Sequence, residues 1–156
     1  MKINKWLDPV HKTIVYSIAV IFGLMVIVGF FQVSNRYLLN SSLSWSEEFQ
    51  KFAHIWLICL TIPVAYKNSA HLGMDIIFKK LSIKNQFLFM QLVNTLWLLF
   101  GVLLVIYSMK LILVAENQMS PGLGISMGWV YSGLLIGNIY LIITALQKLI
   151  ENSKPN

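Results

Sequence analysis

The sequence predicts an all-α integral membrane protein, with four transmembrane helices and a short amphipathic cytoplasmic segment between the second and the third. Three observations predict this class. Of the 156 residues, 57% are hydrophobic and only 12% are charged, whereas about 25% of the residues in a soluble domain are charged. Four apolar stretches are long enough to cross a hydrocarbon core about 30 Å thick. The single cysteine, Cys59, argues against a disulfide scaffold or a cysteine-based zinc site.

The four spans are expected at residues 13–34, 45–66, 86–109 and 128–147. The first is longer than the apolar region of a signal peptide, about 7–15 residues, and no small-residue cleavage pattern follows it, so we expect it to be retained. The fourth is expected to begin after a turn that contains Pro121 and two glycines. The spans leave no room for a second domain, and residues 1–156 are expected to form one four-helix unit.

Basic residues predict that both termini lie in the cytoplasm. Nine lysines belong to the N-terminal tail, the second loop and the C-terminal tail, whereas the other side carries three basic residues. Lysine and arginine collect on the cytoplasmic side of membrane proteins. This rule accounts for the net charge of +6 without a nucleic-acid partner. The basic, amphipathic residues 76–81 are expected to lie on the inner membrane surface, in contact with lipid.

The start of the second span combines a helix-start signal with unusual polarity. Ser44 and Glu47 fit a capping box, which predicts a helix beginning near Trp45. Polar residues then follow helical spacing into the membrane, and two interpretations stay open. Their side chains could reach outward from an interfacial turn, or they could contact a neighbouring membrane protein. For the second interpretation, the candidate subunit-interface residues are Trp45, Glu47, Glu48, Lys51 and His54.

Small and polar residues indicate where the helices pack. Gly133 and Gly137 lie four positions apart in the fourth span, a spacing that lets two helix backbones approach closely. Packing inside the bundle is favoured over use by a partner protein. In the third span, Gln91, Asn94 and Thr95 share one face and predict a polar seam with another helix.

The sequence offers no constellation for catalysis, so no catalytic residue, no metal ligand and no cofactor is expected. The alternative function is a membrane-embedded electron carrier or enzyme, such as a b-type cytochrome with haem between two histidines. His54 and His71 are expected at opposite membrane surfaces, which disfavours that alternative. A transporter acting alone would need an ionisable residue deep in the membrane, and the first, third and fourth spans contain none. The bundle is better suited to supporting another protein.

Several short segments, taken in order, resemble the small membrane subunit of a TRAP transporter, the DctQ-like or SiaQ-like family. The family pattern is an arginine ending the first helix, a Trp-x-Glu-Glu start to the second, a basic residue after it, and a histidine with an aspartate four positions later. The matching residues are Arg36, Trp45, Glu47, Glu48, Lys67, His71 and Asp75. The resemblance assigns no role to Arg36, Lys67, His71 or Asp75.

The resemblance implies a three-part importer in the bacterial inner membrane. A periplasmic binding protein would capture an organic acid, such as a C4-dicarboxylate or sialic acid. A large membrane subunit would carry this solute by an elevator-type movement driven by a sodium gradient. The small subunit would pack against the static scaffold of the large one. The implied partners are therefore the large membrane subunit, the periplasmic solute-binding protein and membrane lipid.

Overall fold

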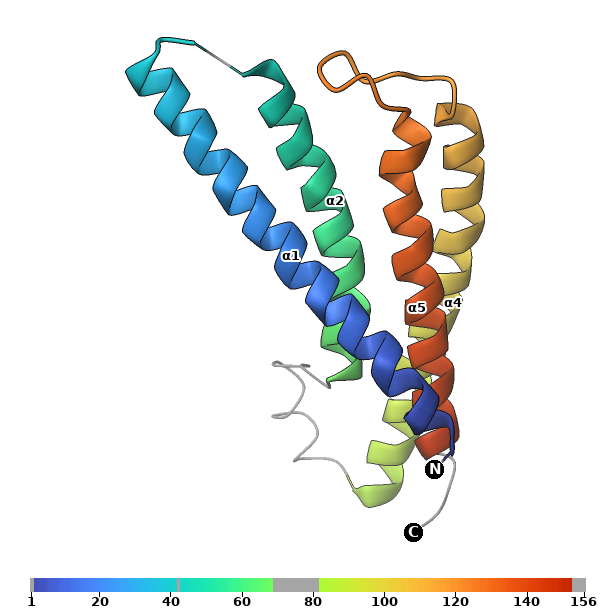
Figure 1. The fold of residues 1–156 in the computed structure, drawn as a ribbon. Helices are drawn as coiled ribbons and strands as arrows, with labels where there is room; N and C mark the ends of the chain where they lie inside the picture. Colours follow the sequence, from blue (N-terminus) through green and yellow to red (C-terminus); the bar gives the residue numbers. More distant parts are fainter. Residues whose placement is uncertain (1, 42, 69–81, 153–156) are drawn as a thin grey trace.

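The computed structural model describes residues 2–41, 43–68 and 82–152. Within these residues the chain forms four helices: α1 (Lys2–Leu38), α2 (Ser44–Lys67), α4 (Ile83–Ala115) and α5 (Met127–Asn152), shown in Figure 1. Each contains one predicted span and is long and apolar enough to cross a membrane. The predicted all-helical fold with four spans is therefore confirmed. The predicted amphipathic segment 76–81 lies outside the described residues.

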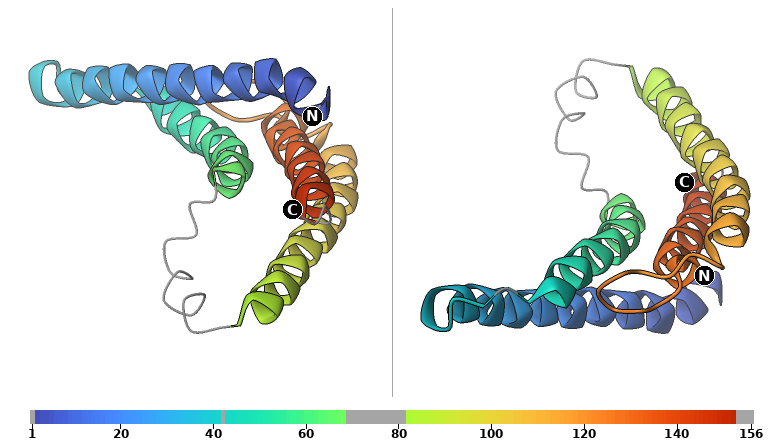
Figure 2. Two further views of the ribbon diagram at one scale, coloured as in Figure 1. Left: turned by 90° about the horizontal axis from the view of Figure 1, so that it is seen from below. Right: turned by 90° about the horizontal axis from the view of Figure 1, so that it is seen from above.

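The helices alternate in direction, so the loops gather at two ends of the molecule. One end holds the start of α1 and the end of α5, and we call it the terminal end (Figure 1). The other holds the α1–α2 connection and the α4–α5 loop, residues 116–126, and we call it the loop end. Helices α4 and α5 pack side by side, α2 packs on α5, and α1 crosses α2 obliquely (Figures 1 and 2).

Tyr66 of α2 lies at the centre of the buried core, near the terminal end. It packs with Leu141 and Ala145 of α5, and its ring centroid lies 5.2 Å from that of Trp97 in α4. Its hydroxyl donates a hydrogen bond of 2.7 Å to Oδ1 of Asn94, which is 3% exposed. Through these separate contacts, Tyr66 joins α2 to both α4 and α5.

The predicted polar seam of the third span is correct at Asn94 but wrong at Thr95. Thr95 is exposed, and its hydroxyl donates to the Gln91 carbonyl of its own helix at 2.8 Å. A threonine hydroxyl in a helix can donate to the backbone carbonyl four residues earlier in the same helix. It therefore needs no second helix, whereas the Asn94 amide does.

The two glycines of α5 lie directly against α2. A Cβ atom added at Gly133 would come within 2.8 Å of the Trp56 ring. A Cβ atom added at Gly137 would collide with the backbone carbonyl of Cys59. The absence of side chains at these two positions lets α5 and α2 pack closely in the middle of the bundle.

Helix α1 is the least packed of the four, since no residue of its most apolar stretch is buried. Two polar contacts join it to the other described helices. The Gln50 side-chain nitrogen of α2 donates to the Met25 carbonyl at 2.8 Å. Nearer the terminal end, His11 Nδ1 lies 2.8 Å from the hydroxyl of Tyr140 in α5. With 37 residues, α1 is about 55 Å long, so it must tilt to fit a bilayer core of about 30 Å.

Candidate subunit interface at the start of α2

Helix α2 begins one residue earlier than a capping box would require. Leu43 is the N-cap residue, with φ −91° and ψ 94°, and no side chain caps the helix. The backbone N–H and the hydroxyl of Ser46 both donate to the Leu43 carbonyl, at 3.0 Å and 2.6 Å. The predicted capping box of Ser44 and Glu47 is therefore wrong. Ser44 already belongs to the helix, and the buried Ser46 forms the local bonds instead.

The carboxylate of Glu48 is held by the α4–α5 loop. It accepts hydrogen bonds from the Ser120 hydroxyl at 2.8 Å, the Gly122 N–H at 2.9 Å and the Leu123 N–H at 2.9 Å. A Cβ atom at residue 122 would lie 3.0 Å from this carboxylate, so the loop approaches closely because residue 122 is glycine. Glu48 is thus engaged within its own chain.

The α4–α5 loop has a defined shape of its own. Met119 and Ser126 form a short antiparallel bridge, and Gly124 adopts a left-handed φ of +65° between them. The Ser126 hydroxyl donates to the Glu116 carbonyl at 2.7 Å. The sequence predicts a turn around Pro121 but does not predict that this turn binds the Glu48 carboxylate. The available signal was a proline- and glycine-rich turn whose free N–H groups suit an anion.

The other candidate interface residues face outward. Glu47, Lys51 and His54 are exposed and lie on one face of α2, and the exposed residues Ile58 and Ile62 continue that face. We call these five residues the outer ridge of α2. It lies opposite the face that packs on α5. Among the described residues, none forms a hydrogen bond or ion pair with the side chains of Glu47, Lys51 or His54.

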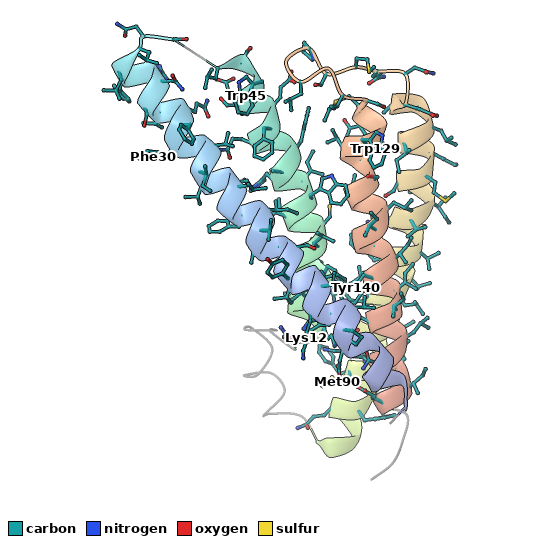
Figure 3. All side chains as sticks on the ribbon, in the orientation of Figure 1. Lys12, Phe30, Trp45, Met90, Trp129 and Tyr140 are labelled. Carbon is teal, nitrogen blue, oxygen red and sulfur yellow. The ribbon has the colours of Figure 1, made fainter. Side chains whose placement is uncertain are left out.

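Gln50, the fourth residue of the predicted polar stripe, and Trp45 are placed differently from the ridge. Gln50, which shares the helical spacing, turns toward α1 and bonds to the Met25 carbonyl. Trp45 is 40% exposed at the start of α2, at the loop end (Figure 3), and helical spacing places it on a different face from the ridge. The stripe predicted from spacing therefore divides into an outward-facing part and a part used for packing within the chain.

The residues of the family pattern are spread over both ends of the molecule. Arg36 is exposed in the last turn of α1, where a positive charge suits the helix dipole. Lys67 is partly buried at the end of α2, and its charge interacts with that of His11. His71 and Asp75 lie outside the described residues. In the part that the structure describes, no group of histidine, cysteine and acidic residues could hold a metal ion.

Residues 9–154 match the family model described as "Tripartite ATP-independent periplasmic transporters, DctQ component". The chain belongs to the DctQ family of TRAP transporter small permeases. Family membership confirms the resemblance seen in the sequence and identifies a multi-pass membrane component of a transporter, not an enzyme.

Individual relatives of this DctQ protein are distant. A Haemophilus influenzae protein provisionally named a TRAP transporter small permease is 26% identical over the whole chain and over 93% of its own length. The sialic acid TRAP transporter small permease SiaQ of Vibrio cholerae is 26% identical over 79% of the chain and 71% of its own length.

A third relative bears on the partners of the family. The isethionate TRAP transporter permease DctMQ of Oleidesulfovibrio alaskensis is 32% identical over 52% of the chain, which is 13% of that much longer protein. Its name joins the M and Q components. Membership of the DctQ family implies a DctM large subunit and a periplasmic binding protein as partners.

Proposed function

We propose that this chain is the non-catalytic small subunit of a sodium-driven importer of an organic acid. In this role it is a static scaffold for the elevator-type large subunit. Distant relatives are named for C4-dicarboxylate, sialic acid and isethionate. Their shared chemistry supports an organic anion as the solute, and a C4-dicarboxylate or sialic acid is the proposal that follows from the resemblance.

The observation that carries the scaffold proposal is the polar part of the outer ridge. Glu47, Lys51 and His54 are exposed on a helix that can span the membrane. Polar groups facing lipid are costly, and such residues normally face protein or water. A neighbouring membrane protein can supply the hydrogen bonds that lipid cannot. We therefore propose that the large subunit covers the outer ridge of α2 and also contacts the exposed Trp45 in the first turn of this helix.

We also propose an orientation in the bacterial inner membrane, with both termini in the cytoplasm and the loop end at the periplasmic surface. The start of α1 and the end of α5 lie at the same end of the bundle, in agreement with this topology (Figure 1). The ratio of nine basic residues to three supports the direction. The outer ridge then contacts the large subunit close to the periplasm, on the side where the binding protein docks.

Co-purification tests the proposed interface. A tagged large subunit should retain the wild-type chain in detergent and lose most of it when Lys51→Ala is combined with His54→Ala, or when Trp45→Ala is introduced. Lys110→Ala removes an exposed lysine from α4 and is the matched control, which should remain fully bound. Full retention of the Lys51/His54 double variant would show that the large subunit does not use this ridge.

Reconstituted transport tests the scaffold role itself. Proteoliposomes that contain the large subunit and receive the binding protein from outside should show sodium-driven uptake only when this chain is present. Undiminished uptake without this chain would contradict an essential scaffold role. Binding of the solute by this chain alone would contradict its assignment as a subunit without a transport site.

A further inference from the structure

A hydrophobic groove lies between α1, α2 and α5. It consists of two adjoining hollows of about 320 Å³ and 410 Å³, and Ile21 of α1 and Trp56 of α2 line both. The first hollow extends toward the α4–α5 loop and ends near Trp129, which Figure 3 labels. The second extends toward the terminal end, along Ile14 of α1 and Ile136 of α5.

We propose that this groove binds one anionic phospholipid, with an acyl chain between the helices and the headgroup at the terminal end. The lining supports a hydrocarbon ligand. The first hollow is lined only by aliphatic and aromatic side chains. The second adds the hydroxyl of Tyr16, a side chain that is 72% exposed, and that of Ser17, which already donates to the Thr13 carbonyl at 3.0 Å. A ligand in this groove therefore contacts mainly apolar side chains and finds few hydrogen-bond partners.

The length of the groove suits an acyl chain. Along α1 the groove runs from Ile14 to Leu24, which is about 15 Å of helix. This is about half of a bilayer hydrocarbon core about 30 Å thick. The groove therefore has the depth of one lipid leaflet.

Charge places the headgroup at the terminal end. Lys67 continues the face of α2 that carries Trp56 and Leu60 of the groove, and it lies close enough to His11 for their charges to interact. The acidic residue that also interacts with His11 is Asp8. In the proposed topology, nine basic and three acidic residues of the sequence belong to the cytoplasmic side, whereas three of each belong to the periplasmic side. Basic sites between helices at the cytoplasmic surface favour anionic headgroups.

Native mass spectrometry of the purified full-length chain tests the headgroup. Phosphatidylglycerol and phosphatidylcholine with identical acyl chains are titrated separately, and phosphatidylglycerol should bind more tightly. Lys67→Gln should weaken phosphatidylglycerol binding about fivefold, the expected contribution of one lysine near an anionic lipid, and leave phosphatidylcholine binding unchanged. Lys110→Gln, at the loop end, is the control and should change neither. Equal binding of the two lipids, unaffected by Lys67→Gln, would overturn the assigned headgroup.

Groove-filling substitutions test the acyl-chain site. Ala53→Phe should fill the first hollow and abolish binding of both lipids, and Leu92→Trp on the exposed face of α4 should have no effect. If Ala53→Phe fails to fold, Val20→Trp at the exposed rim of the second hollow gives the same readout. A folded variant that binds phosphatidylglycerol like the wild type would disprove the site. So would a photo-crosslinker at Ile136 that attaches to the large subunit instead of lipid in the assembled complex.

Discussion

The carboxylate of Glu48 and the hydroxyl of Ser120 are hydrogen-bonded at 2.8 Å, although 72 residues separate them in the chain. The bond joins the first turns of α2 to the loop between α4 and α5. The N–H groups of Gly122 and Leu123 complete the contact. The loop end is thereby tied together at the place where α1 lies far from α5 (Figure 1).

Glu48 is expected to stabilise the subunit without holding its partner. Glu48→Ala should lower the melting temperature measured by tryptophan fluorescence, and Glu48→Gln should lower it less, because an amide oxygen can still accept from the loop. Ser120→Ala removes a buried hydroxyl that donates to Glu48 and accepts a longer bond, 3.3 Å, from the Leu123 N–H. It should cost about 1 kcal/mol, or about 2–4 °C. Glu47→Ala, which removes the neighbouring exposed carboxylate, should change little.

Co-purification with the large subunit is expected to separate Glu48 from the residues of the outer ridge. Glu48→Ala should still bind the large subunit, whereas the Lys51/His54 double variant should lose it at an unchanged melting temperature. If Glu48→Ala melts like the wild type but fails to co-purify, Glu48 acts at the subunit interface and the intrachain contact is unimportant.

Gly137 is expected to tolerate no side chain. Gly137→Ala would place a methyl group against the Cys59 carbonyl and should destabilise the fold by about 1–3 kcal/mol, the usual cost of overpacking. Gly23→Ala is the matched control in α1, where nothing lies within 4 Å of the added atom. It should stabilise by up to about 1 kcal/mol, because glycine weakens a helix interior. Equal melting temperatures for the two variants would argue against close packing of α5 on α2.

The contact between Tyr66 and Asn94 is expected to behave as a coupled pair. Tyr66→Phe leaves the buried Asn94 side chain without its hydroxyl donor and should cost about 1–3 kcal/mol. Replacing both partners, as Tyr66→Phe with Asn94→Leu, should recover much of that loss because no buried polar group remains. A double-mutant cycle on unfolding free energies measures this coupling. Additive losses would show that the two side chains do not depend on each other.

Cysteine labelling is expected to give the proposed orientation. In a Cys59→Ala background, Ser41→Cys should react with a membrane-impermeant maleimide applied from the periplasmic side. Ser82→Cys, exposed at the opposite end of the bundle, should react only after the inner membrane is disrupted. The reverse pattern would place the loop end in the cytoplasm and overturn the proposed topology.

The spans could be predicted from the sequence, but the helix ends could not. Burial in lipid requires long apolar stretches, and these are visible in the composition of each segment. A helix does not stop where the apolar stretch stops, since charged residues are equally able to form backbone hydrogen bonds. Helix α1 therefore begins at Lys2 and α4 continues to Ala115, both well beyond the expected spans.

The role of Glu48 could not be predicted, because a carboxylate near a helix start has several explanations. The helix dipole favours it there, and a polar stripe in a membrane suggests a partner protein. Which explanation holds depends on the approach of residues 120–123, which the tertiary fold determines. The prediction of a capping box at Ser44 and Glu47 was wrong for a related reason. Ser44 and Ser46 are equally plausible local donors in the sequence, and the burial of Ser46 decided between them.

The bare surface of α1 makes a saturation mutagenesis screen of this helix directly interpretable. Since no residue of its most apolar stretch is buried, most positions there should accept any residue that is compatible with lipid. Positions near the Gln50 and Tyr140 contacts, and the partly buried positions where α1 crosses α2, have a reason inside the chain to be selective. A fully exposed α1 position that accepts a single amino acid is therefore expected to touch another molecule, and such positions would map the contacts of this helix with its surroundings.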